Sequence, residues 1–181
     1  AGQDPSPWVL ARGRVGSSHV GDSAPMGPRT DGARISAPIL RRMEDVATMT
    51  TFSTLALRPP LLAALSQIGY AEMTEIQAAA LPLLLEKHDI VGQAKTGSGK
   101  TAAFGLSILQ NLKVNQPGPQ SLVLCPTREL ADQVASEIRR LASQLPNTRV
   151  LVLCGGRPFY HQTQRLKHGA SVVVGTPGRL L

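Results

Sequence analysis

The stretch Ala94-Lys95-Thr96-Gly97-Ser98-Gly99-Lys100-Thr101 decides the fold of this 181-residue chain. It follows a short segment, 89–93, that we expect to form a strand, and it opens a segment, 100–112, that we expect to form a helix. Gly97 and Gly99 permit a tight turn in which successive backbone N–H groups point inward. Those donors and the helix N-terminus can hold phosphate groups. The stretch therefore predicts a phosphate-binding loop (P-loop), rather than a Gly-rich turn with an incidental lysine.

The residue types in the P-loop indicate what each of them would bind. Lys100 supplies a point charge for the β- and γ-phosphates of a nucleotide, and Thr101 offers a hydroxyl to Mg²⁺. Ala94 stands where the common pattern has its first glycine. We therefore expect a nucleoside triphosphate with Mg²⁺ along the whole stretch from Ala94 to Thr101, with Lys100 and Thr101 contributing to catalysis.

Strands and helices alternate along the rest of the chain. Short apolar runs at 121–125, 149–154 and 171–174 predict buried strands. Helices are predicted at 61–68, 75–85, 128–141 and 158–168, the second capped by Thr74 and kinked at Pro82. This order predicts an α/β fold, a parallel sheet with helices on both faces. Ligands of such sheets bind at the carboxyl ends of the strands, where the motifs of this chain fall.

Residues 1–48 differ in composition from the rest of the chain. They hold 6 Gly, 5 Pro and 5 Ser without a helical or strand period, so we expect them to be disordered. Met49 marks the boundary, and if it is the natural start, residues 1–48 are upstream sequence without function. Residues 49–181 carry +6 of the net charge of +7, with 13 Lys and Arg against 7 Asp and Glu. This excess favours an anionic partner.

The two cysteines and the hydropathy narrow the classes of protein to which this chain could belong. Cys125 and Cys154 each end an apolar run, and no Cys-x-x-Cys spacing exists, which favours two buried free thiols over a zinc site. No stretch of 18 apolar residues and no apolar signal-peptide core occur, so we expect a cytoplasmic protein without a membrane partner. The oligomeric state does not follow from the sequence.

Four further segments lie around the P-loop. Upstream, Gly69-Tyr70-Ala71-Glu72-Met73-Thr74-Glu75-Ile76-Gln77 follows Phe52 by 17 residues. Downstream lie Pro126-Thr127-Arg128-Glu129-Leu130-Ala131, then Gly155-Gly156, then Thr176-Pro177-Gly178-Arg179. In this order and spacing the segments resemble the Q motif, motif Ia, the GG motif and the TPGR motif of the DEAD-box RNA helicases. The resemblance covers residues 52–181 and implies a RecA-like P-loop NTPase domain, with the Q motif at about residues 50–78.

The resemblance implies a role for each segment. Gln77 would read the adenine edge of ATP and Phe52 would stack on its face, although Met73 stands where the family has proline. RNA would lie across the other three segments, contacted through its backbone rather than its base edges. Arg128 and Arg179 would each either contact RNA or hold their loop. The implied RNA-binding residues are Pro126, Thr127, Arg128, Gly155, Gly156, Thr176, Pro177, Gly178 and Arg179.

The segments around Phe52, Lys100 and Arg128 look most like the DbpA-type bacterial subgroup, which implies ribosomal RNA or pre-ribosomal particles as partners in large-subunit assembly. The 181 residues contain no Asp-Glu-Ala-Asp. We therefore expect a domain incomplete at its C-terminus, inactive as an ATPase on its own, in which the strand at 89–93 lacks its usual neighbours. A non-catalytic nucleotide- or RNA-binding fragment, a gene remnant and a DNA helicase are the alternatives.

Overall fold

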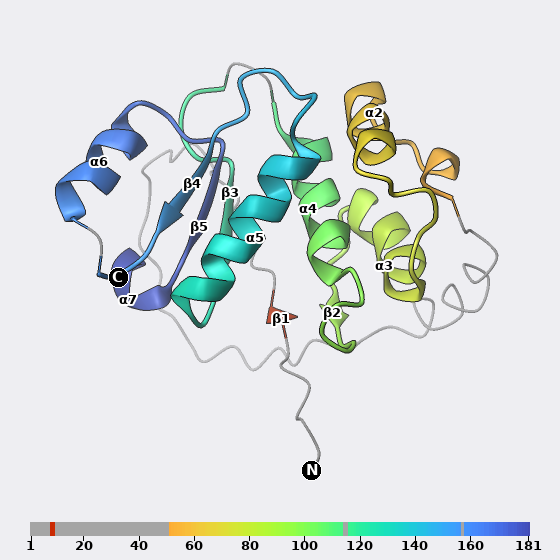
Figure 1. The fold of residues 1–181 in the computed structure, drawn as a ribbon, viewed down its shortest axis with the longest axis horizontal. Coiled ribbons are helices and arrows are strands. Elements are labelled where there is room, and N and C mark those ends of the chain that lie inside the picture. Colours follow the sequence, from red (N-terminus) through yellow and green to blue (C-terminus); the bar gives the residue numbers. More distant parts are fainter. Residues whose placement is uncertain (1–7, 10–50, 114–115, 157) are drawn as a thin grey trace, which may run out of the picture.

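The computed structural model describes residues 8–9, 51–113, 116–156 and 158–181, and its elements follow the predicted alternation (Figure 1). The prediction that residues 1–48 are disordered concerns residues outside this described part, apart from Trp8–Val9. In chain order the elements are β1 (Trp8–Val9), the 3-10 helix η2 (Phe52–Thr54), α2 (Pro59–Gln67), α3 (Glu75–Leu85), β2 (Val91–Gly92), α4 (Lys100–Asn111), β3 (Ser121–Leu124), α5 (Arg128–Leu141), β4 (Val150–Leu153), α6 (Phe159–Lys167), β5 (Val172–Gly175) and α7 (Pro177–Leu180).

A three-stranded parallel sheet in the order β3-β5-β4 forms the centre of the fold. Leu122 of β3 and Leu151 of β4 both pair with Val173 of the central strand. Helix α5 connects β3 to β4 and crosses one face of the sheet (Figure 1), where Val134 and Ile138 are buried. Leu180 of α7 packs against a second cluster formed with Leu151 and Val173. The parallel sheet and its helices confirm the predicted α/β class.

The prediction that the strand at 121–125 is fully buried is wrong. Within β3, Val123 is buried, but Leu122 and Leu124 are 43% and 42% exposed. Successive side chains of a strand point to opposite faces, and β3 lies at the edge of the described sheet. Its inner face therefore packs on the main core, whereas the two leucines belong to neither hydrophobic cluster.

The strand before the P-loop is shorter than predicted and does not join the parallel sheet. Only Val91–Gly92 is a strand, and it pairs antiparallel with Trp8–Val9. Val91 is 77% exposed. Helix α4 nevertheless anchors this region, because Ala103, Leu106 and Leu109 are buried in the main core.

Candidate functional site: a P-loop and three loops at the sheet edge

The P-loop joins β2 to the N-terminus of α4 and has the backbone geometry that its glycines predict. Gly97 and Gly99 have φ angles of +82° and +89°, a region that L side chains rarely adopt. Gly99 is the residue that precedes helix α4, which begins at Lys100. The first N–H groups of α4 are therefore directed toward the loop, as a phosphate site requires.

Lys100 closes the P-loop on itself. Its ammonium group donates to the backbone carbonyl of Ala94 and, at 2.8 Å, to that of Lys95. The hydroxyl oxygen of Ser98 is buried and has no hydrogen-bond partner among the described residues. A cation that bonds to loop carbonyls and a buried hydroxyl without a partner in this described region both fit a polar, anionic ligand. Thr101, half-buried in the first turn of α4, has the hydroxyl chemistry for Mg²⁺ of a bound nucleotide.

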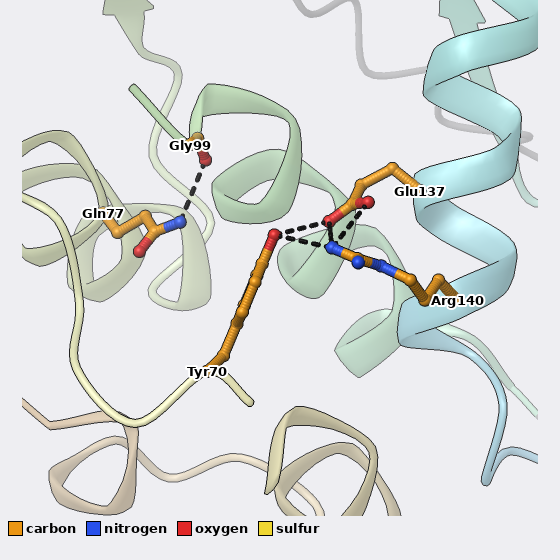
Figure 2. A network of polar contacts seen from close by, with 5 residues as sticks. All are labelled: Tyr70, Gln77, Gly99, Glu137 and Arg140. Carbon is orange, nitrogen blue, oxygen red and sulfur yellow. Dashed lines mark hydrogen bonds and ion pairs between the residues drawn. The ribbon is translucent and has the colours of Figure 1, made fainter. Parts of the chain in front are cut away.

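Two side chains at the start of α3 hold the P-loop from outside, and Figure 2 shows one of them, Gln77, directed at Gly99. The amide nitrogen of Gln77 donates to the carbonyl of Gly99 at 3.1 Å, and its amide oxygen accepts from the backbone N–H of Thr74 at 2.9 Å. The Thr74 hydroxyl donates to the carbonyl of Ser98 at 2.8 Å. Gln77 is only 3% exposed. The predicted cap of α3 thus also links that helix to the P-loop.

Phe52 lies in the hydrophobic core of this structure. It is 3% exposed, and its ring stacks on Tyr70 with centroids 6.3 Å apart. Phe52 and Gln77 are both buried, and their side chains are engaged with protein partners. Adenine stacking by Phe52 and base reading by Gln77 stay predictions.

Tyr70 is also the centre of a polar network that the sequence did not reveal (Figure 2). Its hydroxyl donates to Glu137 at 3.0 Å and accepts from Arg140 at 2.8 Å, and Arg140 pairs with Glu137 at 3.1 Å. Burial, followed by the hydrogen bond to Glu137, raises the pKa of Tyr70 above its ordinary value of 10.0. The network fastens the segment before α3 to the last turn of α5.

The three remaining motifs lie together because they follow neighbouring parallel strands. The backbone N–H of Cys125 donates to the carbonyl of Gly175, and that of Thr176 donates to the carbonyl of Leu153. The segments after β3, β4 and β5 therefore meet at one edge of the sheet. In Figure 1 the start of α5, helix α7 and the loop between β2 and α4 all lie along the lower side of the molecule.

The residues predicted to contact RNA are accessible at this edge. Pro126, Thr127, Arg128, Gly156, Pro177 and Gly178 are exposed, and Gly155, Thr176 and Arg179 are partly exposed. The Thr127 hydroxyl caps α5 by accepting from the N–H of Leu130 at 3.2 Å. An ideal Cβ on Gly155 would lie 3.5 Å from the Arg128 guanidinium. The structure thus places Arg128 of the first motif over the glycine pair of the second.

Gln162 of α6 holds the end of β4 and was missed by the sequence analysis. It is buried, and its amide oxygen accepts from the backbone N–H of Cys154 at 3.1 Å while its amide nitrogen donates to the Cys154 carbonyl at 3.0 Å. The side chain thus acts as a strand partner directly before Gly155. A single glutamine in a weakly periodic helix gives no sequence signal for this role.

Both cysteines are buried free thiols, as predicted. Burial, with a smaller contribution from Cys154, raises the pKa of the Cys125 thiol to about 11. Within the ranges that the structure describes, no group of three or more His, Cys, Asp or Glu side chains is arranged to hold a metal ion. None of the helices in these ranges combines the length and the apolar character that crossing a membrane requires.

Comparison with known proteins agrees with the motif arrangement. The family model "DEAD/DEAH box helicase" matches residues 74–181. ATP-dependent RNA helicase DbpA of Escherichia coli (strain K12) is 59% identical over 134 residues, which cover 74% of this chain and 29% of that protein. ATP-dependent RNA helicase DeaD of Buchnera aphidicola subsp. Schizaphis graminum (strain Sg) is 51% identical over 134 residues, which cover 74% of this chain and 22% of that protein.

The fold has a solved counterpart as well. The crystal structure of a DEAD box protein from the hyperthermophile Methanococcus jannaschii superposes with a TM-score of 0.68 at 40% identity, covering 73% of this chain and 36% of that one. The chain spans less than a third of the length of the curated relatives described above. The predicted resemblance, including the likeness to DbpA, is confirmed. This chain belongs to the DEAD/DEAH box helicase family.

Proposed function

We propose that this chain is the nucleotide-binding and RNA-binding part of an ATP-dependent RNA helicase. The observation that carries the proposal is the P-loop, in which two glycines have positive φ. Within the described part of the chain, its buried Ser98 hydroxyl has no partner and Lys100 is held only by loop carbonyls. ATP binding would exchange those carbonyl contacts of Lys100 for phosphate oxygens. Mg²⁺, when bound with the nucleotide, would neutralise phosphate charge beside the Thr101 hydroxyl.

RNA would lie along the sheet edge where the segments after β3, β4 and β5, here the strand-end segments, meet. Exposed backbone at Gly156 and Gly178 permits close approach of a sugar-phosphate chain, and the start of α5 directs N–H groups outward beside Arg128. These groups match phosphates rather than base edges, so binding should be insensitive to base sequence and should weaken as salt is added.

We further propose that the polypeptide of 181 residues binds ATP without turning it over. Phosphoryl transfer depends on positioned charges, and the sequence contains no Asp-Glu-Ala-Asp carboxylates to supply them. For the whole helicase, the likeness to DbpA supports ribosomal RNA or pre-ribosomal particles as the substrate. RNA-stimulated release of phosphate by the purified chain would contradict the proposal that this polypeptide does not turn ATP over.

The test of nucleotide binding uses a fluorescent ATP analogue titrated into the wild-type chain and into Lys100→Ala. The variant should weaken binding by roughly 10- to 100-fold, because it removes charge-assisted hydrogen bonds of about 1.5–3 kcal/mol each. Lys113→Ala, a lysine beyond the end of α4, is the matched control and should bind like the wild type. Equal affinity of wild type and Lys100→Ala would reject the proposed site.

A further inference from the structure

Two aromatic side chains are exposed at the first turn of α6. Phe159 and Tyr160 are each 67% exposed, whereas Phe52 and Phe104 are buried in the core. Only 3% of the chain is aromatic. Adjacent exposed rings are a departure from this pattern, and contiguous exposed apolar surface is one mark of a binding site.

The position of Phe159 relates it to the strand-end segments. It lies three residues after Gly156, and the guanidinium carbon of Arg179 lies 5.7 Å from the centre of its ring. In Figure 1 the beginning of α6 lies near α7, the helix that carries Arg179. The Phe159 ring therefore connects the GG turn with the TPGR segment, both of which are proposed to hold the RNA backbone.

We propose that Phe159, with Tyr160 beside it, is a stacking platform for one base of the bound RNA strand, an inference that rests on the proposed RNA binding. Segments that grip phosphates leave the bases free to project, and an aromatic ring accepts any base because each has a π-face. Arg179 supports the platform through its cation–π contact and attracts the polyanion.

An RNA strand fits this surface better than an apolar protein partner does. The rings adjoin the cationic Arg179, and Arg165 of the same helix is exposed. An apolar partner would have to remove these charges from water, at a cost that a polyanion does not incur. Tyr160 contacts His161 in an edge-to-face arrangement, with ring centres 5.9 Å apart, and its side chain is among the exposed ones.

The experiment is a thermodynamic cycle between the protein ring and the RNA base. Binding of a fluorescein-labelled ten-residue uridine RNA is measured for the wild-type chain, Phe159→Ala, Phe159→Leu and Phe159→Trp. The same proteins are titrated with oligonucleotides that each carry one abasic position. Leu166→Ala, which removes another exposed apolar side chain from α6, is the matched control. Far-ultraviolet circular dichroism checks that every variant is folded.

We expect Phe159→Ala and Phe159→Leu to weaken binding of intact RNA about fivefold or more, the lower end of the effect of removing an aromatic that stacks on a base. Phe159→Trp and Leu166→Ala should bind like the wild type. One abasic position should weaken wild-type binding by a similar factor. The RNA affinity of Phe159→Ala should be the same for the intact oligonucleotide and for the one with that abasic position.

Three results would decide against the platform. They are unchanged binding by Phe159→Ala, an equal loss with every abasic oligonucleotide, and full binding by Phe159→Leu. The second and third would indicate a structural or merely apolar role, such as contact with another protein segment. If the wild-type chain itself fails to bind uridine RNA, the proposed RNA-binding function fails, and the platform with it.

Discussion

The proposed nucleotide-binding side and the proposed RNA-binding side of this molecule, here the nucleotide side and the RNA side, are held in different ways. On the RNA side, the functional segments follow three strands that share a continuous ladder of parallel hydrogen bonds. On the nucleotide side, β2 is two residues long and lies outside that sheet. The P-loop is held instead by Gln77 of α3 and Thr74, the cap of that helix, and by the packing of α4.

The difference shows that two loops of the same kind can depend on different interactions. Backbone ladders tolerate side-chain changes, whereas the P-loop depends on side-chain contacts, among them the buried Gln77 amide that bonds to Gly99 and to the cap of α3. Substitutions near Gln77 should therefore disturb nucleotide binding and stability together. Substitutions at the sheet edge should affect RNA binding with less effect on stability.

The largest expected effect that tests this comparison comes from Gly99→Ala. A Cβ at position 99 would collide with the Gln77 amide, which is buried and bonded on both sides. We expect a loss of roughly 2–4 kcal/mol in unfolding free energy, from the strain of a positive φ and the loss of up to two hydrogen bonds.

Gly97→Ala is the matched control, because its φ is also positive but nothing lies within 4 Å of the added carbon. It should lose about 1–2 kcal/mol from backbone strain alone. Urea unfolding of both variants measures the difference. If the two lose the same stability, the Gln77 contact does not hold the P-loop.

A smaller and separable effect is expected from Gly156→Ala on the RNA side. The new Cβ would displace the Arg128 guanidinium, which is the flexible end of an exposed side chain. Gly118→Ala has a similar φ and open space, so both variants should lose about 1–2 kcal/mol of stability from backbone strain. Only Gly156→Ala should weaken RNA binding, about tenfold, without altering nucleotide affinity. Equal RNA affinities of the two variants would contradict a role for the Arg128 position.

The smallest effect is expected from Tyr70→Phe, which keeps the ring on Phe52 and removes only the hydroxyl contacts to α5. The loss should be about 0.5–1.5 kcal/mol at neutral pH. Folding raises the pKa of Tyr70, so the protonated hydroxyl adds to the free energy of unfolding below pH 10. This contribution is lost as the pH rises through the pKa of Tyr70 in the folded protein. Above pH 10 the gap between wild type and variant should therefore narrow. Urea midpoints at pH 8 and pH 10.5 measure it, and a constant gap would count against the network.

Much of the fold followed from local pattern. The cap at Thr74 and the apolar period of α5 predicted Glu75–Leu85 and Arg128–Leu141 with the bounds that the structure has. These elements were predictable because capping chemistry and a 3.6-residue period are local properties. The exposure of Leu122 was not predictable, because it depends on which strand lies at the sheet edge.

The sequence by itself determined the chemistry of the P-loop and the order of the motifs, because glycines, a lysine and a hydroxyl at fixed spacing act over a few residues. Only the tertiary structure decided that Gln77 holds Gly99, that Arg128 lies over the glycine pair, and that Tyr70 joins α5 to Phe52. Those contacts join residues from 18 positions apart, Phe52 and Tyr70, to 70 positions apart, Tyr70 and Arg140. Chain packing, rather than local preference, determines which of them meet.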